Sequence, residues 1–442
     1  MWPFRRAGFD DHRGGVTGTL SLPTADQVTR SPDDRRPVTL AAVWTAGVAL
    51  AFVVVRDGSF GWQLARVLAV AVGTLWVHRS VSGRSGRTWS VMAMGLVALV
   101  VGAGIGLPHA VKSGFTLASA AGTCALASGI WLVAWSATRM VASLSTWRRR
   151  GALVAQVLGV VLLMWTFVPA VMATNVPPIA LGQRTPADVG LVSVDVELTT
   201  SDGVPLAAWY VPSTNDAAVV IRHGAGSTRT NVLDQAAVLA GGGYGTLLVD
   251  ARGHGASEGR AMDFGWNGDA DIIAAVDYLT TRTDVDPTRI GVVGLSMGGE
   301  EAIGALGADH RIRAVVAEGA TGRTSADKSW LSDEFGLRGW FQEQLDRARY
   351  VLVDVLTAAP TPPSLASSVV AAQPRHVLLI TAGEVADEAH AAGHIRSASP
   401  TTVQVWNVPG AGHTAGHDTE PEAWRQHVLA FLDTHLAAPD AP

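Results

Sequence analysis

Five long apolar runs restrict the fold of this chain more than any other feature of its sequence. They cover residues 38–55, 61–78, 89–107, 115–138 and 152–173. Each approaches the roughly 20 residues that a helix needs to cross the hydrocarbon of a bilayer. Five such runs in succession are hard to bury in a soluble bundle. We therefore predict a polar N-terminal tail at 1–37 and a membrane region of five transmembrane helices at 38–174.

The charges between these runs alternate. Arginines precede the first run, follow the second at positions 79–87 and follow the fourth at positions 139–150, whereas the other two connections hold few charges. Basic loops stay preferentially in the cytoplasm. A multi-pass protein of the cell membrane is expected, with its N-terminus in the cytoplasm and its C-terminal half on the extracytoplasmic side. The second run contains Arg66, and its failure to insert would reverse that side.

The two parts of the chain differ strongly in charge. Residues 1–151 hold 16 Arg and Lys against 6 Asp and Glu, while residues 152–442 hold 17 against 32. The acidic C-terminal part argues against nucleic acid as a partner. Cys124 is the single cysteine, so no intrachain disulfide can form.

The segment 175–189 is rich in proline and small polar residues and is expected to be a linker. Beyond it, residues 192–199 and 206–211 resemble the two strands of a hairpin. Short Val-, Ile- and Leu-rich runs then alternate with helical stretches, at 218–221, 246–249, 290–293, 314–317, 377–380 and 403–405. This alternation predicts an α/β domain over 190–442, with a mostly parallel sheet covered by helices on both faces.

The strongest chemical signal is the G-x-S-x-G sequence at residues 294–298, which follows an apolar strand and precedes a helix. Ser296 would occupy a tight, strained turn that the flanking glycines allow to close. Its hydroxyl would then be exposed at the carboxyl end of the sheet. The N–H of Met297, at the head of the helix, would point to where an oxyanion forms.

A serine nucleophile needs a base, and the base needs an orienting carboxylate. His413 follows the last predicted strand in a loop of small residues and is preferred over His417. The acid should follow the penultimate strand, so that the chain order is serine, acid, histidine. Asp387 is the first choice there, with Glu384 and Glu388 as alternatives.

Small residues also follow the first parallel strand, at 224–227. Ala225 would supply a second oxyanion donor from this loop, and His223 is expected to hold the loop by hydrogen bonds. We interpret Asp250, Arg252 and His254, after the next strand, as structural residues.

In their order, His223-Gly224, the run from Asp250 to Gly259, Gly294–Gly298 and His413 resemble the α/β-hydrolases. The run 250–259 looks like the branch of serine peptidases, dienelactone-hydrolase-like enzymes and related esterases. The resemblance covers roughly 190–438 and implies Ser296 as nucleophile, His413 as base, a carboxylate within 384–388, and the amides of Met297 and Ala225 as oxyanion hole. The family often has Gly-x-x-Asp after the acid-bearing strand. Here Ala386 occupies that position and Asp387 comes one residue later.

About 55 residues separate the strand that ends near Glu318 from the one that starts at His376. In this fold such an insertion resembles a lid, which we place at about 320–374. Its aromatic residues would either line a pocket for an acyl chain or pack the lid on the domain. These residues are Trp330, Phe335, Trp340, Phe341 and Tyr350.

Together these features predict a membrane-anchored serine hydrolase that cleaves an ester, thioester or amide through an acyl-enzyme on Ser296. The substrate is expected to be a small molecule or lipid-like, and membrane lipid would surround the N-terminal helices. The motifs call for no cofactor and no metal, and they leave the oligomeric state open. Two alternatives remain: an acyltransferase with the same site, and an inactive hydrolase fold that serves as a binding module. A transporter is disfavoured because the apolar runs hold few ionisable residues at their centres.

Overall fold

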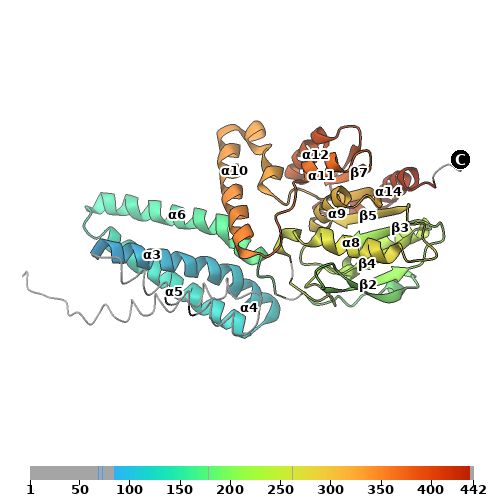
Figure 1. Cartoon of the computed structure of the whole chain (residues 1–442). Coiled ribbons are helices and arrows are strands. Elements are labelled where there is room, and N and C mark those ends of the chain that lie inside the picture. Colours follow the sequence, from blue (N-terminus) through green and yellow to red (C-terminus); the bar gives the residue numbers. More distant parts are fainter. Residues whose placement is uncertain (1–67, 69–71, 73–83, 178, 261, 439–442) are drawn as a thin grey trace, which may run out of the picture.

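The computed structural model describes residues 84–177, 179–260 and 262–438, together with positions 68 and 72. The predicted tail and the first two predicted spans, 38–55 and 61–78, lie outside the described residues apart from those two positions. The described chain forms a group of long helices followed by a domain built on one sheet (Figure 1).

The N-terminal helices coincide in position with the last three predicted spans. They are α3 (Arg84–Val101), the π-helical η2 (Gly102–Gly106), α4 (Leu107–Ser113), α5 (Leu117–Met140) and α6 (Thr146–Ala173). Three stretches, Thr88–Ser113, Ser119–Met140 and Thr146–Ala173, are long and apolar enough to cross a membrane by length and composition. The crossing itself, and its direction, stay predictions.

Glycines allow α5 to pack closely against the helix formed by α3, η2 and α4. A Cβ atom built on Gly122 would overlap the Cα of Gly106, and one built on Gly102 would lie 2.6 Å from the Cα of Leu126. Small residues at such a contact let two helix backbones approach each other.

The C-terminal domain contains an eight-stranded sheet in the order β1-β2-β4-β3-β5-β6-β7-β8. β1 and β2 form the predicted antiparallel hairpin, β2 pairs antiparallel with β4, and the remaining neighbours are parallel. The strands are β1 (Val194–Thr199), β2 (Pro205–Val211), β3 (Ala218–Arg222), β4 (Gly245–Val249), β5 (Ile290–Leu295), β6 (Ile312–Glu318), β7 (His376–Ala382) and β8 (Val403–Val408). The expected mostly parallel sheet is therefore present.

Helices cover both faces of the sheet, because the central strands are buried on both sides. Apolar residues of α8 (Gly268–Leu279), α9 (Met297–Ala308), α11 (Leu365–Ala371) and α12 (Ala386–Ala398) form one core with the sheet. Those of α7 (Leu233–Gly241) and α14 (Pro421–His435) form the other. The short α13 (Gly416–Thr419) and the 3-10 turns η3 (Pro186–Val189), η4 (Arg229–Val232), η5 (Asp263–Gly265) and η6 (Ser325–Lys328) complete the domain.

Two predicted segments contact the rest of the chain more than the sequence indicates. Within the expected linker, Ile179 forms a β-bridge with His254 and Leu181 packs on the domain core. Within the expected lid, α11 belongs to the layer that covers the sheet, since Leu365 and Val369 are buried in its core. The long helix α10 (Leu331–Leu356) remains as the protruding part of that insertion.

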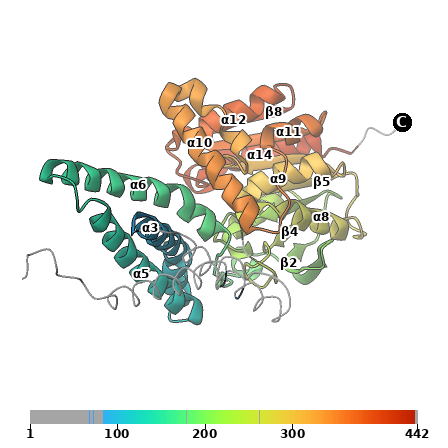
Figure 2. The same ribbon diagram turned by 60° about the vertical axis from the view of Figure 1, so that its left-hand side comes forward.

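α10 joins the sheet domain to α6. From the C-terminal end of α6 it rises steeply away from that helix in both ribbon views (Figures 1 and 2). Leu352 and Leu356 of α10 pack with Val171 of α6. The guanidinium group of Arg349 donates to the backbone carbonyls of Thr166 and Trp165, at 3.3 and 3.4 Å. The two parts of the chain are therefore held together by apolar packing and by hydrogen bonds.

We predict that Gly122→Val destabilises the helical part, because its side chain cannot fit beside Gly106 without separating α5 from η2. Overpacking of this kind typically costs about 1–3 kcal/mol. Thermal unfolding of the full chain in detergent measures the effect. The matched control is Gly159→Val in α6, where no atom lies within 4 Å of the new Cβ. Equal melting temperatures for the two variants would contradict the proposed close contact.

Candidate active site

Ser296 occupies a sharp turn between β5 and α9. Its φ of 53° and ψ of −122° lie in a region that non-glycine residues rarely adopt. The turn closes because neighbouring backbone takes the place of side chains: a Cβ on Gly294 would overlap the carbonyl of Gly298, and one on Gly298 would lie 2.6 Å from the carbonyl oxygen of His223. The G-x-S-x-G sequence therefore forms the strained turn that it predicts.

His413 lies beside the hydroxyl group of Ser296. Its Nε2 is 2.8 Å from Ser296 Oγ, and its Nδ1 is 2.6 Å from Glu388 Oε1. With Nδ1–H donating to Glu388, Nε2 is free to accept the proton of Ser296. The hydrogen bond to Glu388 raises the pKa of His413 above its usual value, although partial burial opposes the shift. The other histidine considered, His417, packs edge-on against Trp424.

The carboxylate next to His413 belongs to Glu388 and not to Asp387, which corrects the first choice made from the sequence. α12 begins at Ala386, so residues 387 and 388 lie in its first turn and point about 100° apart. Asp387 and Glu384 are exposed, whereas the side chain of Glu388 is only 1% exposed. The second oxygen of Glu388 accepts from the backbone N–H of Ala382, at 2.8 Å.

Glu318 is a site residue that the sequence analysis missed. It ends β6, and its carbonyl accepts a 2.7 Å hydrogen bond from the N–H of Ser296. Its buried carboxylate accepts from Gly416 N–H and Trp424 Nε1, at 2.7 and 2.9 Å, and so fixes the loop that carries His413. Burial raises the pKa of Glu318. The available signal was a carboxylate at the carboxyl end of a buried strand.

Glu300, in the first turn of α9, is a second missed residue. It accepts hydrogen bonds from the backbone N–H groups of Thr321 and Gly322, at 3.0 and 2.8 Å. Burial raises its pKa. Through these bonds α9 holds the loop that follows β6. Nearby Gly319 must be glycine, because its φ is +71° and a Cβ there would lie 2.9 Å from the imidazole of His413.

The loop after β3 lies directly against the nucleophile. A Cβ on Gly224 would be 3.1 Å from the Cβ of Ser296. Ala225 follows on this loop, while Met297 occupies the first position of α9. Within the described residues, neither the amide of Ala225 nor that of Met297 donates a hydrogen bond. Both are therefore available as oxyanion donors, although their aim at a bound substrate stays a prediction.

Two buried histidines fix that loop, as expected for His223. The N–H of Ala251 donates to His223 Nε2 at 2.9 Å, so Nδ1 carries the proton and donates to the carbonyl of Gly224 at 2.8 Å. His254 Nε2 accepts from Gly226 N–H at 3.4 Å. Burial lowers the pKa of both imidazoles, which keeps them neutral and favours these bonds.

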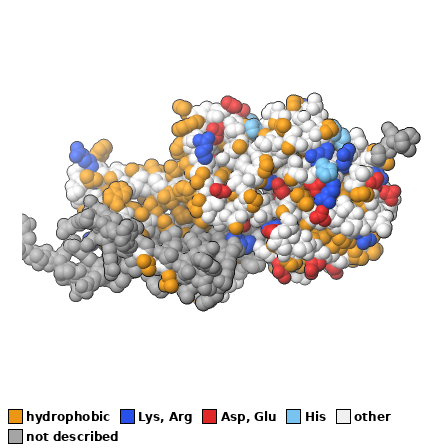
Figure 3. Space-filling view, in the orientation of Figure 1, with side chains coloured by type: hydrophobic (Ala, Val, Ile, Leu, Met, Phe, Trp, Pro, Cys, Tyr) orange, Lys and Arg blue, Asp and Glu red, His pale blue; other side chains and the backbone are white. Residues whose placement is uncertain are grey.

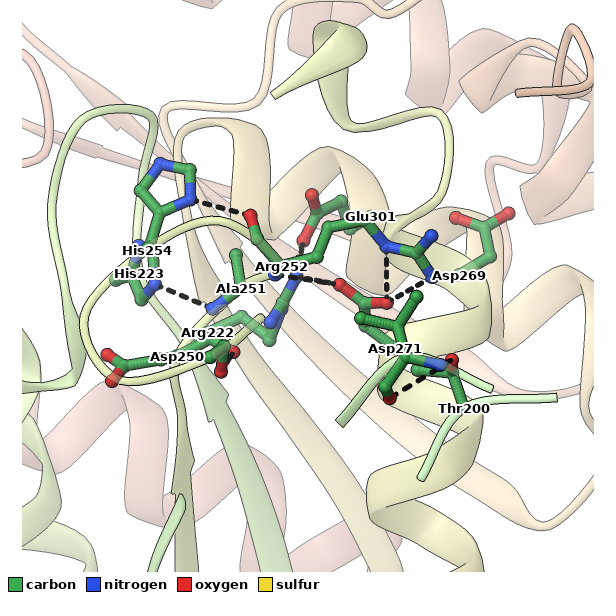
Figure 4. A network of polar contacts seen from close by, with 12 residues as sticks. Thr200, Arg222, His223, Asp250, Ala251, Arg252, His254, Asp269, Asp271 and Glu301 are labelled. Carbon is green, nitrogen blue, oxygen red and sulfur yellow. Dashed lines mark hydrogen bonds and ion pairs between the residues drawn. The ribbon is translucent and has the colours of Figure 1, made fainter. Parts of the chain in front are cut away.

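A buried ionic network connects β3, α8 and α9 (Figure 4). Arg222 of β3 contacts Glu301 of α9 at 2.6 Å and Asp271 of α8 at 3.4 Å. Arg252 contacts the same Asp271 at 2.7 Å. Asp250 accepts from the N–H groups of Arg229 and Ala256. Asp250, Arg252 and His254 thus make structural contacts, whereas His413 lies against the hydroxyl of Ser296.

Among the described residues, no group of three or more His, Cys, Asp or Glu side chains could hold a metal ion.

Residues 213–393 match the family model described as serine aminopeptidase, S33. The C-terminal domain has the α/β-hydrolase fold. The match includes the nucleophile turn and Glu388, and it supports a hydrolase. We call residues 190–438 the hydrolase domain.

Curated relatives match shorter parts of this domain. An uncharacterized protein of Mycobacterium tuberculosis is 38% identical over 113 residues, which are 25% of this chain and 40% of that protein. The α/β hydrolase domain-containing protein WAV2 of Arabidopsis thaliana and the thiohydrolase aneE of Aspergillus aculeatus are each 35% identical over 126 residues, 28% of this chain and 40% of theirs. The chain thus spans about 40% of the length of these relatives.

Among solved structures, an esterase of Pyrococcus furiosus, Pf2001, is 25% identical. It covers 59% of this chain and 100% of its own, with a TM-score of 0.46. A dienelactone hydrolase of Anabaena variabilis is 18% identical and covers 55% of this chain and 98% of its own, with a TM-score of 0.41.

The contact between His413 and Glu388 predicts a specific pH dependence for reaction of Ser296 with a fluorophosphonate. Only neutral His413 accepts the serine proton, so the labelling rate falls as the pH drops through the raised pKa of His413. Glu388→Gln removes the cause of the shift and moves this fall to lower pH. It also lowers the maximal rate, by roughly 10²–10⁴-fold if general-base catalysis is lost.

The control is Asp387→Asn, which changes the exposed neighbour and should leave both the rate and its pH profile as in the unmodified protein. A profile that moves with Asp387→Asn but not with Glu388→Gln would reverse the assignment of the acid.

Proposed function

We propose that this protein is a membrane-anchored serine hydrolase that cleaves an ester, thioester or amide bond through an acyl-enzyme on Ser296. One observation carries the proposal: a strained serine, a histidine and a buried carboxylate form a continuous chain of contacts of 2.8 and 2.6 Å. Groups in such contact act as nucleophile, base and orienting acid.

The residues would divide the chemistry as follows. Ser296 Oγ bonds to the substrate carbonyl carbon while its proton moves to His413 Nε2. The negative charge on the carbonyl oxygen is stabilised by the amides of Met297 and Ala225. The bond to the leaving group then breaks, and His413 returns the proton to that group. Water then attacks the acyl-enzyme while its proton moves to His413. The bond between the acyl group and Ser296 Oγ breaks, His413 returns the proton to Oγ, and the acid product leaves.

Glu388 would stabilise the imidazolium that forms in each step. Its buried position between His413 and the amide of Ala382 holds its carboxylate in one orientation. This arrangement removes the argument for an inactive fold, which rested on the displacement of Asp387. A glutamate one residue further along, with a longer side chain, occupies the position of the acid.

The membrane anchor rests on the three apolar helices of the described chain and on the two further apolar runs before them. With five crossings, the distribution of arginines places the hydrolase domain on the extracytoplasmic side. The substrate would be a small or lipid-like acyl compound, because the apolar N-terminal helices would keep the domain close to lipid. The name thiohydrolase of the Aspergillus relative adds thioesters to the bonds worth testing.

The decisive variant is Ser296→Ala in the full-length protein. We expect a fluorophosphonate to label the unmodified chain and to spare the variant, because the probe bonds only to an activated serine oxygen. Hydrolysis of short-chain p-nitrophenyl esters should be lost in parallel. Ser329→Ala, in the turn before α10, is the matched control and should retain both. Equal labelling of Ser296→Ala and the unmodified chain would refute the assignment.

The side of the membrane can be tested with the same chemistry. A membrane-impermeant fluorophosphonate should label Ser296 in intact cells if the domain is extracytoplasmic. Labelling that appears only after the cells are lysed would place the domain in the cytoplasm and imply an even number of crossings.

A further inference from the structure

α10 presents a row of large apolar side chains that no described part of the chain covers. Leu337 is 87% exposed and Val355 is 75% exposed, and exposed apolar residues lie on the same face between them. That face also carries Gln344 and Ala348, between Phe341 and Val351. We call this row the outer stripe. It consists of Leu337, Trp340, Phe341, Val351 and Val355.

The stripe follows the helical repeat, and the domain contacts lie opposite to it. With 100° per residue, its five members fall within about a third of the helix circumference. Gly339, Asp346 and Val353 fall on the opposite face and are buried against the domain. Leu352 and Leu356, which pack with α6, lie between the two faces. The outer stripe therefore borders directly on the contact with α6.

The neighbouring surface of α6 is also apolar and exposed. Only 6% of its most apolar window is buried, against 67% for Thr88–Ser113. Its apolar run 152–173 begins just after Arg148–Arg150 and ends with the helix at Ala173. A helix of that length spans about 33 Å, close to the roughly 30 Å thickness of bilayer hydrocarbon. If α6 crosses the membrane over this run, its C-terminal end lies at the membrane–water interface on the side of the hydrolase domain.

α10 meets α6 between Trp165 and Val171, in the part of this run nearest that interface. Pro169 lacks an N–H group, so the carbonyl of Trp165, four residues earlier, has no donor within α6. Arg349 of α10 donates to this carbonyl and to that of Thr166. A backbone carbonyl near lipid needs such a partner, because no water reaches it in hydrocarbon. The proline thus creates an acceptor for α10 at the interface.

We propose that α10 is an in-plane membrane-surface helix, with its outer stripe among the headgroups and upper acyl chains of the bilayer that α6 crosses. This inference rests on the membrane anchor in the proposed function, but not on catalysis. α10 rises steeply from the end of α6 (Figures 1 and 2), so it runs near the membrane plane if α6 follows the membrane normal. Figure 3 shows hydrophobic side chains along α6 and up the adjoining border of α10.

Lipid fits the stripe better than a second protein chain. The stripe borders the lipid-length surface of α6, and it lies beside the C-terminal part of that helix. Its exposed charged neighbours are mixed in sign, Arg338 and Arg347 against Asp354. The contact therefore depends on apolar insertion and should form on vesicles of neutral phosphatidylcholine.

Site-specific fluorescence in proteoliposomes tests the inference. The single native cysteine is first removed as Cys124→Ser, and a polarity-sensitive dye is then attached at Leu337→Cys or Val351→Cys in the outer stripe. Val161→Cys, exposed on α6, reports membrane insertion. Thr281→Cys, exposed in the turn after α8, is the control for a position in water. Quenchers are phosphatidylcholine with a nitroxide at defined acyl positions and iodide in the buffer.

We expect the labels at 337 and 351 to be quenched most by nitroxides near the headgroups, and the label at 161 by nitroxides deep in the chains. Only the label at 281 should respond mainly to iodide. If the stripe labels behave like the label at 281, or are shielded from both quenchers by protein, while the label at 161 is lipid-quenched, the inference is overturned alone. If the label at 161 is not lipid-quenched, the membrane anchor fails and the inference fails with it.

The role of Arg349 is tested separately with Arg349→Met in the Val351→Cys protein. Losing the donors to α6 should free the C-terminal half of α10 and cause loss of lipid quenching at 351. Arg347→Met is the matched control, since within the described residues Arg347 bonds only to Gln344 on its own helix. Unchanged quenching in Arg349→Met would show that the stripe holds α10 without the contact to α6.

Discussion

The close approach of three backbone segments around Ser296 is the constraint on which the site depends. The end of β5, the start of α9 and the loop after β3 meet where Gly294, Gly298 and Gly224 have no side chains. A Cβ on Gly294 or Gly298 would overlap a neighbouring carbonyl, and one on Gly224 would lie tightly against Ser296, at 3.1 Å from its Cβ. The strained conformation of Ser296, costing of order 1–3 kcal/mol, persists because the surrounding elements fix it. Arg222 and Glu301 join the same β3 and α9 from below, as a buried pair.

A second set of contacts places the histidine over that serine. The backbone carbonyl of Glu318 accepts a hydrogen bond from the N–H of Ser296. Its carboxylate accepts one from the N–H of Gly416, in the loop that carries His413. Glu318, at the end of one buried strand, therefore positions both Ser296 and the loop that carries His413. Buried carboxylates surround the imidazole, and burial raises the pKa of both Glu300 and Glu318. Hydrogen bonds from backbone amides offset the free-energy cost of burying these two carboxylates.

The sequence sufficed where the signal is local. Alternating apolar runs predicted the strands, and G-x-S-x-G marked Ser296 because the turn is built from adjacent residues. His413 followed from chain order. The acid did not, because choosing between Asp387 and Glu388 requires the first residue of α12 and the direction of its first turn. Glu318 and Glu300 were missed because their partners lie up to 106 positions away. The helix α10 was identified only as part of a lid, because its contact with α6 joins distant segments.

That last contact also has a consequence for the order of folding. Arg349 and Trp165 are 184 positions apart, and the N-terminal part of a chain is synthesised first. The carbonyl that Pro169 leaves free is therefore made long before its donor exists. More than half of the hydrolase domain must leave the ribosome before α6 can acquire this partner. The joint between the two parts of the molecule therefore forms late, whereas β7, β8 and α14, which complete the sheet domain, are synthesised later still.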